Sequence, residues 1–350
     1  MLITLTKQLA GGKSLTDEQV VHAVVELTGE AETVESKADF LTALAQKGET
    51  TEEISAFAHA LRDMAVPPPL DKVTRSQVIL DVCGTGGDRL NTFNISTTVA
   101  LVMAAAGVKV AKHGNRAVTS QAGSADVLEA LGIRIDLTPA QTAASLRDLD
   151  FAFLFASNFH PAFKQIAPAR QLCGQRKQRT IFNFLGPLLN PAQPDVQLMG
   201  VPRQELCEPI AKVLQSLGVR HGMVVCGSVG DGRFLDEISI LGPTFYSEFS
   251  PAGTGSGTLD LEPFQLQPAT LADLAGADRH ANAEIVRRIL RGEDRGPKRD
   301  AVLVNCAAAM VVAGKSRSCM EGWKMAAEVI DSGRASKKLE ELAASQAGTI

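Results

Sequence analysis

The first 65 residues place hydrophobic side chains at helical spacing. In one segment they recur every three or four positions, at Ile54, Phe57, Ala58, Leu61 and Met64. Thr16 and Thr50 each stand three residues before a Gln or Glu, the capping-box pattern that opens a helix. Residues 66–69 contain three consecutive prolines, which cannot continue a helix. The pattern predicts a helical N-terminal domain over residues 1–70 that ends in a linker or hinge.

After residue 75 short apolar runs alternate with helical segments. The expected strands are residues 78–83, 108–111, 151–156 and 223–226. The expected helices are residues 96–106, 124–131 and one that opens at Thr138-Pro139. This alternation predicts an α/β domain over residues 71–350, with a parallel or mixed sheet flanked by helices. Residues 251–257 and 291–298 are expected to be surface loops.

Composition narrows the class of protein. Hydrophobic residues make up 45% of the 350 residues, which permits a sizeable core and argues against global disorder. The net charge of −4 provides no basic surface for nucleic acid. Six scattered cysteines without a C-x-x-C motif favour reduced thiols in the cytoplasm. No apolar run approaches the roughly 20 residues of a membrane span.

A glycine-rich segment follows the first expected strand and contains Gly84, Gly86 and Gly87. Backbone N–H groups there can approach an anion closely because no Cβ obstructs them. Residues 94–97 then open the next helix, whose unpaired N–H groups suit a phosphate. The spacing matches neither the P-loop nor the Rossmann dinucleotide pattern. A phosphate site is the functional interpretation, and an ordinary tight turn before a capped helix is the alternative.

Two further groups of polar residues accompany this loop. Residues 112–116, Lys-His-Gly-Asn-Arg, follow the second expected strand and suit a ligand with several negative oxygens. A surface ion pair is the favoured interpretation of Arg116. Asp236 and Glu237 are adjacent carboxylates, a pattern that is common on solvated surfaces. Beside a polyphosphate site, however, such a pair can hold Mg²⁺ and so balance the phosphate charge.

Several segments in this order resemble the anthranilate phosphoribosyltransferase family: residues 84–88, 94–97, 112–116, 123–132 and 182–191. The resemblance implies transfer of the phosphoribosyl group of phosphoribosyl pyrophosphate to the amine of anthranilate, the second step of tryptophan biosynthesis. It implies a homodimer with a small helical domain and a larger α/β domain, whose central sheet is mixed and mainly parallel. A helical insertion at about 161–190 would complete the small domain.

The resemblance also implies roles for individual residues. Phosphoribosyl pyrophosphate would be bound by Gly84, Gly87, Asp88, Thr92, Asn94, Ile95, Ser96, Thr97, Lys112, Ser120 and Ser124. Anthranilate would contact Gly84, Asn115 and Arg170. Mg²⁺, expected as two ions per subunit, would be ligated by Ser96, Asp236 and Glu237. No catalytic residue is assigned, and His113 is the candidate for accepting the proton of the amine.

The link between Arg170 and Arg179 is longer than is usual in the family, which makes Arg176 a competitor for the acceptor carboxylate. Two alternatives therefore stay open. One is a phosphoribosyltransferase with another aromatic acceptor, and the other is a non-enzymatic paralogue that binds nucleic acid. The cations of residues 170–177 favour the paralogue, whereas the net charge of −4 opposes it.

Overall fold

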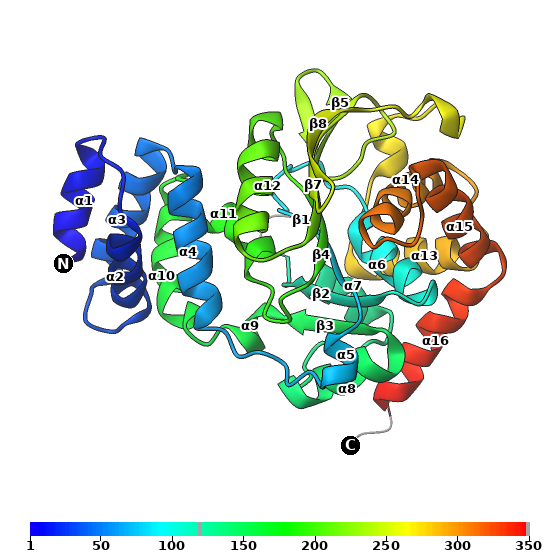
Figure 1. Ribbon diagram of the computed structural model, residues 1–350, viewed down its shortest axis with the longest axis horizontal. Helices are drawn as coiled ribbons and strands as arrows, with labels where there is room; N and C mark the ends of the chain where they lie inside the picture. The colour runs from blue at the N-terminus through cyan, green and yellow to red at the C-terminus, as the bar shows by residue number, and fades with distance from the viewer. Residues whose placement is uncertain (118–120, 348–350) are drawn as a thin grey trace.

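The structure, a computed structural model, describes residues 1–117 and 121–347. The chain opens with four helices: α1 (Leu2–Ala10), α2 (Asp17–Thr28), α3 (Val34–Lys47) and α4 (Thr51–Asp63). Thr16 and Thr50 cap α2 and α4 with complete capping boxes, as the sequence predicts. Helix α10 (Phe163–Gln175) packs against α3 and α2, so a distant segment joins this helical unit (Figure 1).

One mixed sheet of eight strands forms the centre of the larger unit. Its strands are β1 (Ile79–Gly84), β2 (Lys109–Gly114), β3 (Phe151–Phe155), β4 (Val196–Gly200), β5 (His221–Gly230), β6 (Arg233–Leu235), β7 (Thr244–Ser250) and β8 (Gly253–Leu259). The order is β3-β2-β1-β4-β5-β7-β8, with β6 paired to β5. The first five strands of this order run parallel, and the remaining pairings are antiparallel. The predicted α/β class with a mainly parallel sheet is confirmed.

Helices cover both faces of the sheet (Figure 1). One face carries α6 (Ile95–Ala105), α7 (Ser124–Ala130), α13 (Arg279–Leu290), α14 (Pro297–Val312), α15 (Cys319–Asp331) and α16 (Arg334–Ala347) around a large apolar core. The other face carries α8 (Pro139–Leu149) and α12 (Cys207–Ser216). The core beneath α12 continues into the helical unit, so the two units share one apolar interior. The short helices are α5 (Lys72–Arg75), α9 (Ala156–Phe159) and α11 (Phe182–Leu185).

The sequence-based prediction of a loop at residues 251–257 is wrong. Most of this segment belongs to β8, which pairs with β7 along its whole length. Strand β8 lies at the edge of the sheet and its side chains are exposed, so its sequence needs no alternation of apolar residues. Its glycines are also unusual in strands, and they favoured the prediction of a loop. In the second expected loop, residues 291–296 are irregular, but α14 begins at Pro297.

All six cysteines lie in the described part of the chain, and all are free thiols, as the sequence predicts. None of the helices in the described part of the chain combines the length and the apolar character that a membrane span requires.

A buried carboxylate lies inside the sheet. Asp81 on β1 accepts a hydrogen bond from the Asn190 amide at 2.9 Å, and that amide also donates to the Ala111 carbonyl at 2.7 Å. The second carboxylate oxygen of Asp81 has no partner among the described residues. Burial raises the pKa of Asp81 from 3.8 to about 6, against the opposing effect of the Lys112 charge.

We predict that Asp81→Asn stabilises the fold in a pH-dependent manner. The folded state holds the Asp81 proton more tightly than the unfolded state, so ionisation costs stability as pH rises from about 4 to 6. Well above pH 6 the variant should be more stable by about 3 kcal/mol, and near pH 4 the difference should vanish. Urea unfolding at several pH values measures this. Asp231→Asn, at an exposed turn, is the control, and a difference independent of pH would contradict the prediction.

Candidate functional site

A cavity of about 340 Å³ lies where β1 and β2 end, beside the start of α6 and the segment from α10 to α11. Twelve of the site residues predicted from the sequence line it: Gly84, Asp88, Thr92, Asn94, Ile95, Ser96, Thr97, Lys112, Asn115, Ser124, Asp236 and Glu237. Arg170 and His113 line the same cavity. Gly87 instead lines a neighbouring cavity, and Ser120 lies outside the described residues.

Close backbone approach explains two glycines at this site. A Cβ at Gly84 would lie 2.7 Å from the Asp236 Cγ atom. A Cβ at Gly200 would lie 1.6 Å from the Asp236 carbonyl oxygen, a distance that no side-chain adjustment can relieve. Gly84 and Gly200 are paired on the neighbouring strands β1 and β4. The two strand ends therefore form a cradle into which residue 236 fits.

The two adjacent carboxylates are buried and point to different partners. Asp236 accepts hydrogen bonds from the Thr85 hydroxyl at 2.9 Å and from the Gly86 amide at 2.5 Å. Glu237 accepts from the Ser96 amide at 3.1 Å, at the first turn of α6. Burial raises the pKa of both acids, and the charge of Asp88 adds to the shift of Asp236. The sequence left open a solvated surface pair, whereas both side chains are buried in the cavity.

Lys112 is the buried cation of this cavity. Its ammonium donates to the Val82 carbonyl at 2.6 Å and to the Ser96 hydroxyl at 3.3 Å. These contacts hold the charge beside Glu237 at the start of α6, where helix N–H groups also favour an anion. One end of the cavity thus combines backbone donors, a fixed ammonium and carboxylates.

The donor set fits Mg²⁺. The buried charged side chains of the cavity are two acids, Asp236 and Glu237, and one lysine, Lys112, so the charge balance at this end has room for a cation. The described residues contain no cluster of three His, Cys, Asp or Glu side chains that would enclose a metal. Mg²⁺ is commonly held by one or two carboxylates together with water and substrate phosphate oxygens, which matches this open arrangement.

The other end of the cavity is apolar with one arginine. Arg170, on α10, places its guanidinium 5.2 Å from the centre of the Phe182 ring, a cation–π geometry. Phe163 and Pro187 also line this end. Arg176, the competing arginine, instead forms an ion pair with Asp39 at 2.7 Å on the surface. Of the two arginines, only Arg170 lines this cavity.

Asn115 and Arg116 follow β2 at the mouth of the cavity. Asn115 uses its side-chain oxygen to accept from the Arg116 amide at 2.8 Å. The Arg116 guanidinium pairs with Asp126 at 3.0 Å and Glu129 at 3.1 Å. The ion-pair interpretation of Arg116 is confirmed.

His113 is half of a buried histidine pair. Its Nδ1 lies 3.0 Å from the Gly186 carbonyl, and its Nε2 lies 3.2 Å from the Nε2 of His160. The first contact requires a hydrogen on Nδ1, so a neutral His113 presents a bare Nε2 to His160. Burial lowers the pKa of His113 to about 3 and that of His160 to about 4. Both rings are therefore neutral at physiological pH.

Some residues that shape the cavity were not assigned from the sequence. Thr85 and Gly86 fix Asp236, Phe182 lies under Arg170, and the Gly186 carbonyl orients His113. Phe182 and Gly186 belong to segment 182–191, for which the resemblance implies no individual roles. For Thr85, the sequence feature that could have indicated its role is a hydroxyl side chain inside a glycine-rich loop.

Two domain models of one glycosyl transferase family together match nearly the whole chain. Residues 3–65 match the helical bundle domain of a glycosyl transferase family, and residues 76–336 match the a/b domain of that family. The anthranilate phosphoribosyltransferase of Geobacter sulfurreducens is 46% identical over 338 residues, covering 94% of each chain.

Solved structures show the same fold. The anthranilate phosphoribosyltransferase of Thermus thermophilus is 40% identical with a TM-score of 0.86, covering 97% of this chain and 98% of the other. The enzyme of that name from Saccharomyces cerevisiae, in complex with PRPP and Mg, is 30% identical with a TM-score of 0.87. That match covers 99% of this chain and 98% of the yeast chain.

We predict that Gly200→Ala disrupts the cradle around Asp236. The new Cβ would overlap the Asp236 carbonyl, so the fold should lose on the order of 3 kcal/mol of stability. Gly174→Ala is the matched control, because Gly174 lies in α10 with open space at the Cβ position. That control should gain about 0.5–1 kcal/mol from helix propensity. Thermal unfolding measures both, and equal melting temperatures for Gly200→Ala and the parent would refute the proposed overlap.

Proposed function

This chain belongs to the anthranilate phosphoribosyltransferase family, and from that membership we infer its reaction. It transfers the phosphoribosyl group of phosphoribosyl pyrophosphate to the amine of anthranilate and releases pyrophosphate, as a step of tryptophan biosynthesis. The relatives fit this interpretation and not the nucleic-acid-binding alternative. The observation that carries the inference for this chain is the buried pair Asp236–Glu237, tied to the glycine-rich loop and to the start of α6.

We assign the donor to the polar end of the cavity. The backbone around Gly84 and Gly86, the start of α6 and Lys112 would hold its phosphates, because these groups present N–H donors and a fixed positive charge. The remaining predicted donor contacts are Gly87, Asp88, Thr92, Asn94, Ile95, Thr97, Ser120 and Ser124. The Lys112 ammonium is already held by the Val82 carbonyl, so it would stabilise the developing charge without reorganisation.

Ser96, Asp236 and Glu237 would hold Mg²⁺, which supplies positive charge to the leaving pyrophosphate. We propose two ions per subunit. The different directions of the two carboxylates support that number, since Asp236 faces the glycine-rich loop and Glu237 faces the first turn of α6.

The acceptor would lie at the apolar end. Arg170 would pair with its carboxylate, Asn115 and Gly84 would contact it, and Phe163 and Phe182 offer flat apolar surfaces for its ring. In this position the amine attacks C1 of the ribose as the bond from C1 to pyrophosphate breaks. Fixing both reactants in one cavity supplies much of the acceleration of such a reaction.

We propose that the reaction needs no general base from the protein. An aromatic amine is neutral at pH 7 and already nucleophilic, and its proton can leave to water after attack. His113 lines the cavity, but burial lowers its pKa to about 3 and its Nε2 faces His160. Such a ring accepts a proton poorly at neutral pH, so we assign it the task of shaping the acceptor end through Gly186.

We also propose a homodimer, with a cytoplasmic location as the sequence predicts. The exposed large apolar side chains of the helical unit include Ile3 on α1 and Val21 and Val25 on α2. Burial of such side chains between two copies would remove apolar surface from water. Light scattering of the purified chain tests the dimer.

Anthranilate fluorescence tests the reaction directly. We expect the signal to fall with time when the protein, phosphoribosyl pyrophosphate and Mg²⁺ are present together. Chelation of the metal should stop the change, and added Mg²⁺ should restore it, because two of the assigned ligands are carboxylates that need a cation to bind a polyphosphate. A constant signal at high protein concentration would reject anthranilate as the acceptor.

We predict that Arg170→Ala weakens acceptor binding selectively. Loss of the paired guanidinium should raise KM for anthranilate by about 10–100-fold, with KM for phosphoribosyl pyrophosphate little changed. Arg176→Ala is the matched control from the same segment, and it should leave both constants near the parent values because Arg176 pairs with Asp39. If Arg176→Ala gave the larger acceptor effect, the assignment of the two arginines would be reversed.

A further inference from the structure

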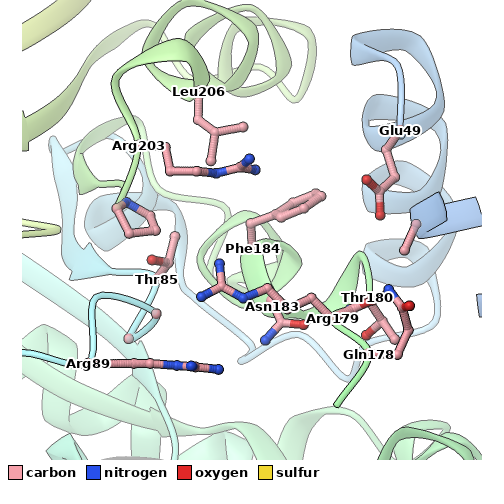
Figure 2. A pocket seen from close by; sticks show the side chains of 14 residues that line it. Glu49, Thr85, Arg89, Gln178, Arg179, Thr180, Asn183, Phe184, Arg203 and Leu206 are labelled. Atoms are coloured by element: carbon pink, nitrogen blue, oxygen red, sulfur yellow. Dashed lines mark hydrogen bonds between the residues drawn. The ribbon is translucent and has the colours of Figure 1, made fainter. Parts of the chain in front are cut away.

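A second cavity, of about 240 Å³, lies between α3 and the glycine-rich loop (Figure 2). We call it the arginine pocket, because it is lined by Arg89, Arg179 and Arg203. Thr85, Gly86 and Arg89 line both this pocket and the main cavity. The glycine-rich loop is thus a shared wall, with the assigned pyrophosphate position on one side and the arginine pocket on the other.

The three guanidinium groups come from separate parts of the chain. Arg89 follows β1, Arg179 lies in the link between α10 and α11, and Arg203 follows β4. Figure 2 shows their side chains entering the pocket from different sides, with the Arg179 guanidinium directed toward Thr85. Independent segments have therefore brought three cations to one small space beside the loop.

These cations are poorly neutralised within the described residues. No ion pair there involves Arg89 or Arg179, and Arg203 has one long contact, 3.5 Å to the exposed Glu205. An exposed pair of this kind contributes little binding energy. Glu49, at the end of α3, is the acidic residue that lines the pocket, and burial raises its pKa more than the nearby Arg203 charge lowers it. The pocket as a whole is positively charged.

The charge and the lining identify the class of ligand. Each guanidinium group can donate two parallel hydrogen bonds to phosphate oxygens. Three such groups offer more donors and more positive charge than a single carboxylate can balance. Gly86 adds open space at the wall, because a Cβ placed there would meet no atom within 4 Å. A compact anion with several charges, such as a diphosphate, fits these features.

We propose that the arginine pocket is a second anion site, which binds inorganic pyrophosphate after it has left the ribose. The inference rests on the proposed function, since that reaction releases pyrophosphate at the opposite side of the shared loop. Residues 85–86 and Arg89 line both cavities, so the released ion would need to move only around one loop to reach the pocket.

Titration calorimetry with Mg²⁺ present tests the site, with inorganic pyrophosphate and phosphoribosyl pyrophosphate as the two probes. We expect two pyrophosphate ions to bind each chain of the parent protein and one molecule of phosphoribosyl pyrophosphate. In a double variant carrying Arg179→Gln and Arg203→Gln, the second pyrophosphate site should weaken at least tenfold. Both arginines are exposed, so the variant should fold, and its melting temperature verifies this.

Arg288→Gln is the matched control, because Arg288 is an exposed arginine on α13, which packs on the face of the sheet away from α12. It should keep both pyrophosphate sites. Loss of the second site in this control would show a general effect of charge and overturn the proposal. A single pyrophosphate site in the parent, or two sites that survive in the double variant, would also overturn it.

The two probes separate this proposal from the proposed function. If phosphoribosyl pyrophosphate also occupied two sites, the pocket would serve the donor, and the assignment to the released product would be wrong. If phosphoribosyl pyrophosphate did not bind, the proposed function would fail, while the pyrophosphate titrations would still decide whether the arginine pocket binds the ion.

Discussion

The contact of Asp236 with the glycine-rich loop organises the site. Its carboxylate accepts from Thr85 and Gly86, and its backbone fits into space that Gly84 and Gly200 leave by lacking a side chain. One residue thereby joins the ends of β1 and β4 to the segment that carries the predicted metal ligands. Glu237 then reaches the start of α6, which fixes the helix terminus relative to the same loop.

Charge balance explains why these parts belong together. The buried acids Asp236 and Glu237 would be costly alone, and Lys112 offsets them only in part. A cation and a polyphosphate complete the balance, so the polar end of the cavity is suited to bind the two as a unit. The apolar end, with Arg170 over Phe182, presents the opposite chemistry and suits a flat ring with one negative charge.

Local patterns in the sequence predicted much of this arrangement. The capping boxes of α2 and α4, the strand before the glycine-rich loop and the helix after it all follow from neighbouring residues. Such local patterns could not predict contacts between residues that are distant in the sequence. Asp236 packs against Gly84 although the two residues are 152 positions apart in the sequence, and only the fold brings them together. The His113–His160 pair and the arginine pocket depend in the same way on segments that meet in space, and β8 lacked the alternation that identifies a strand.

The late arrival of α10 in the helical unit has a consequence for synthesis on the ribosome. Its residues Ile166, Ala169 and Cys173 complete the apolar interior around α1–α4, yet they are translated about a hundred residues after α4 ends. The nascent N-terminal helices therefore keep part of their apolar surface uncovered while β1, β2 and β3 emerge. The two units of this protein must consequently mature together, since neither the bundle nor the sheet can finish first.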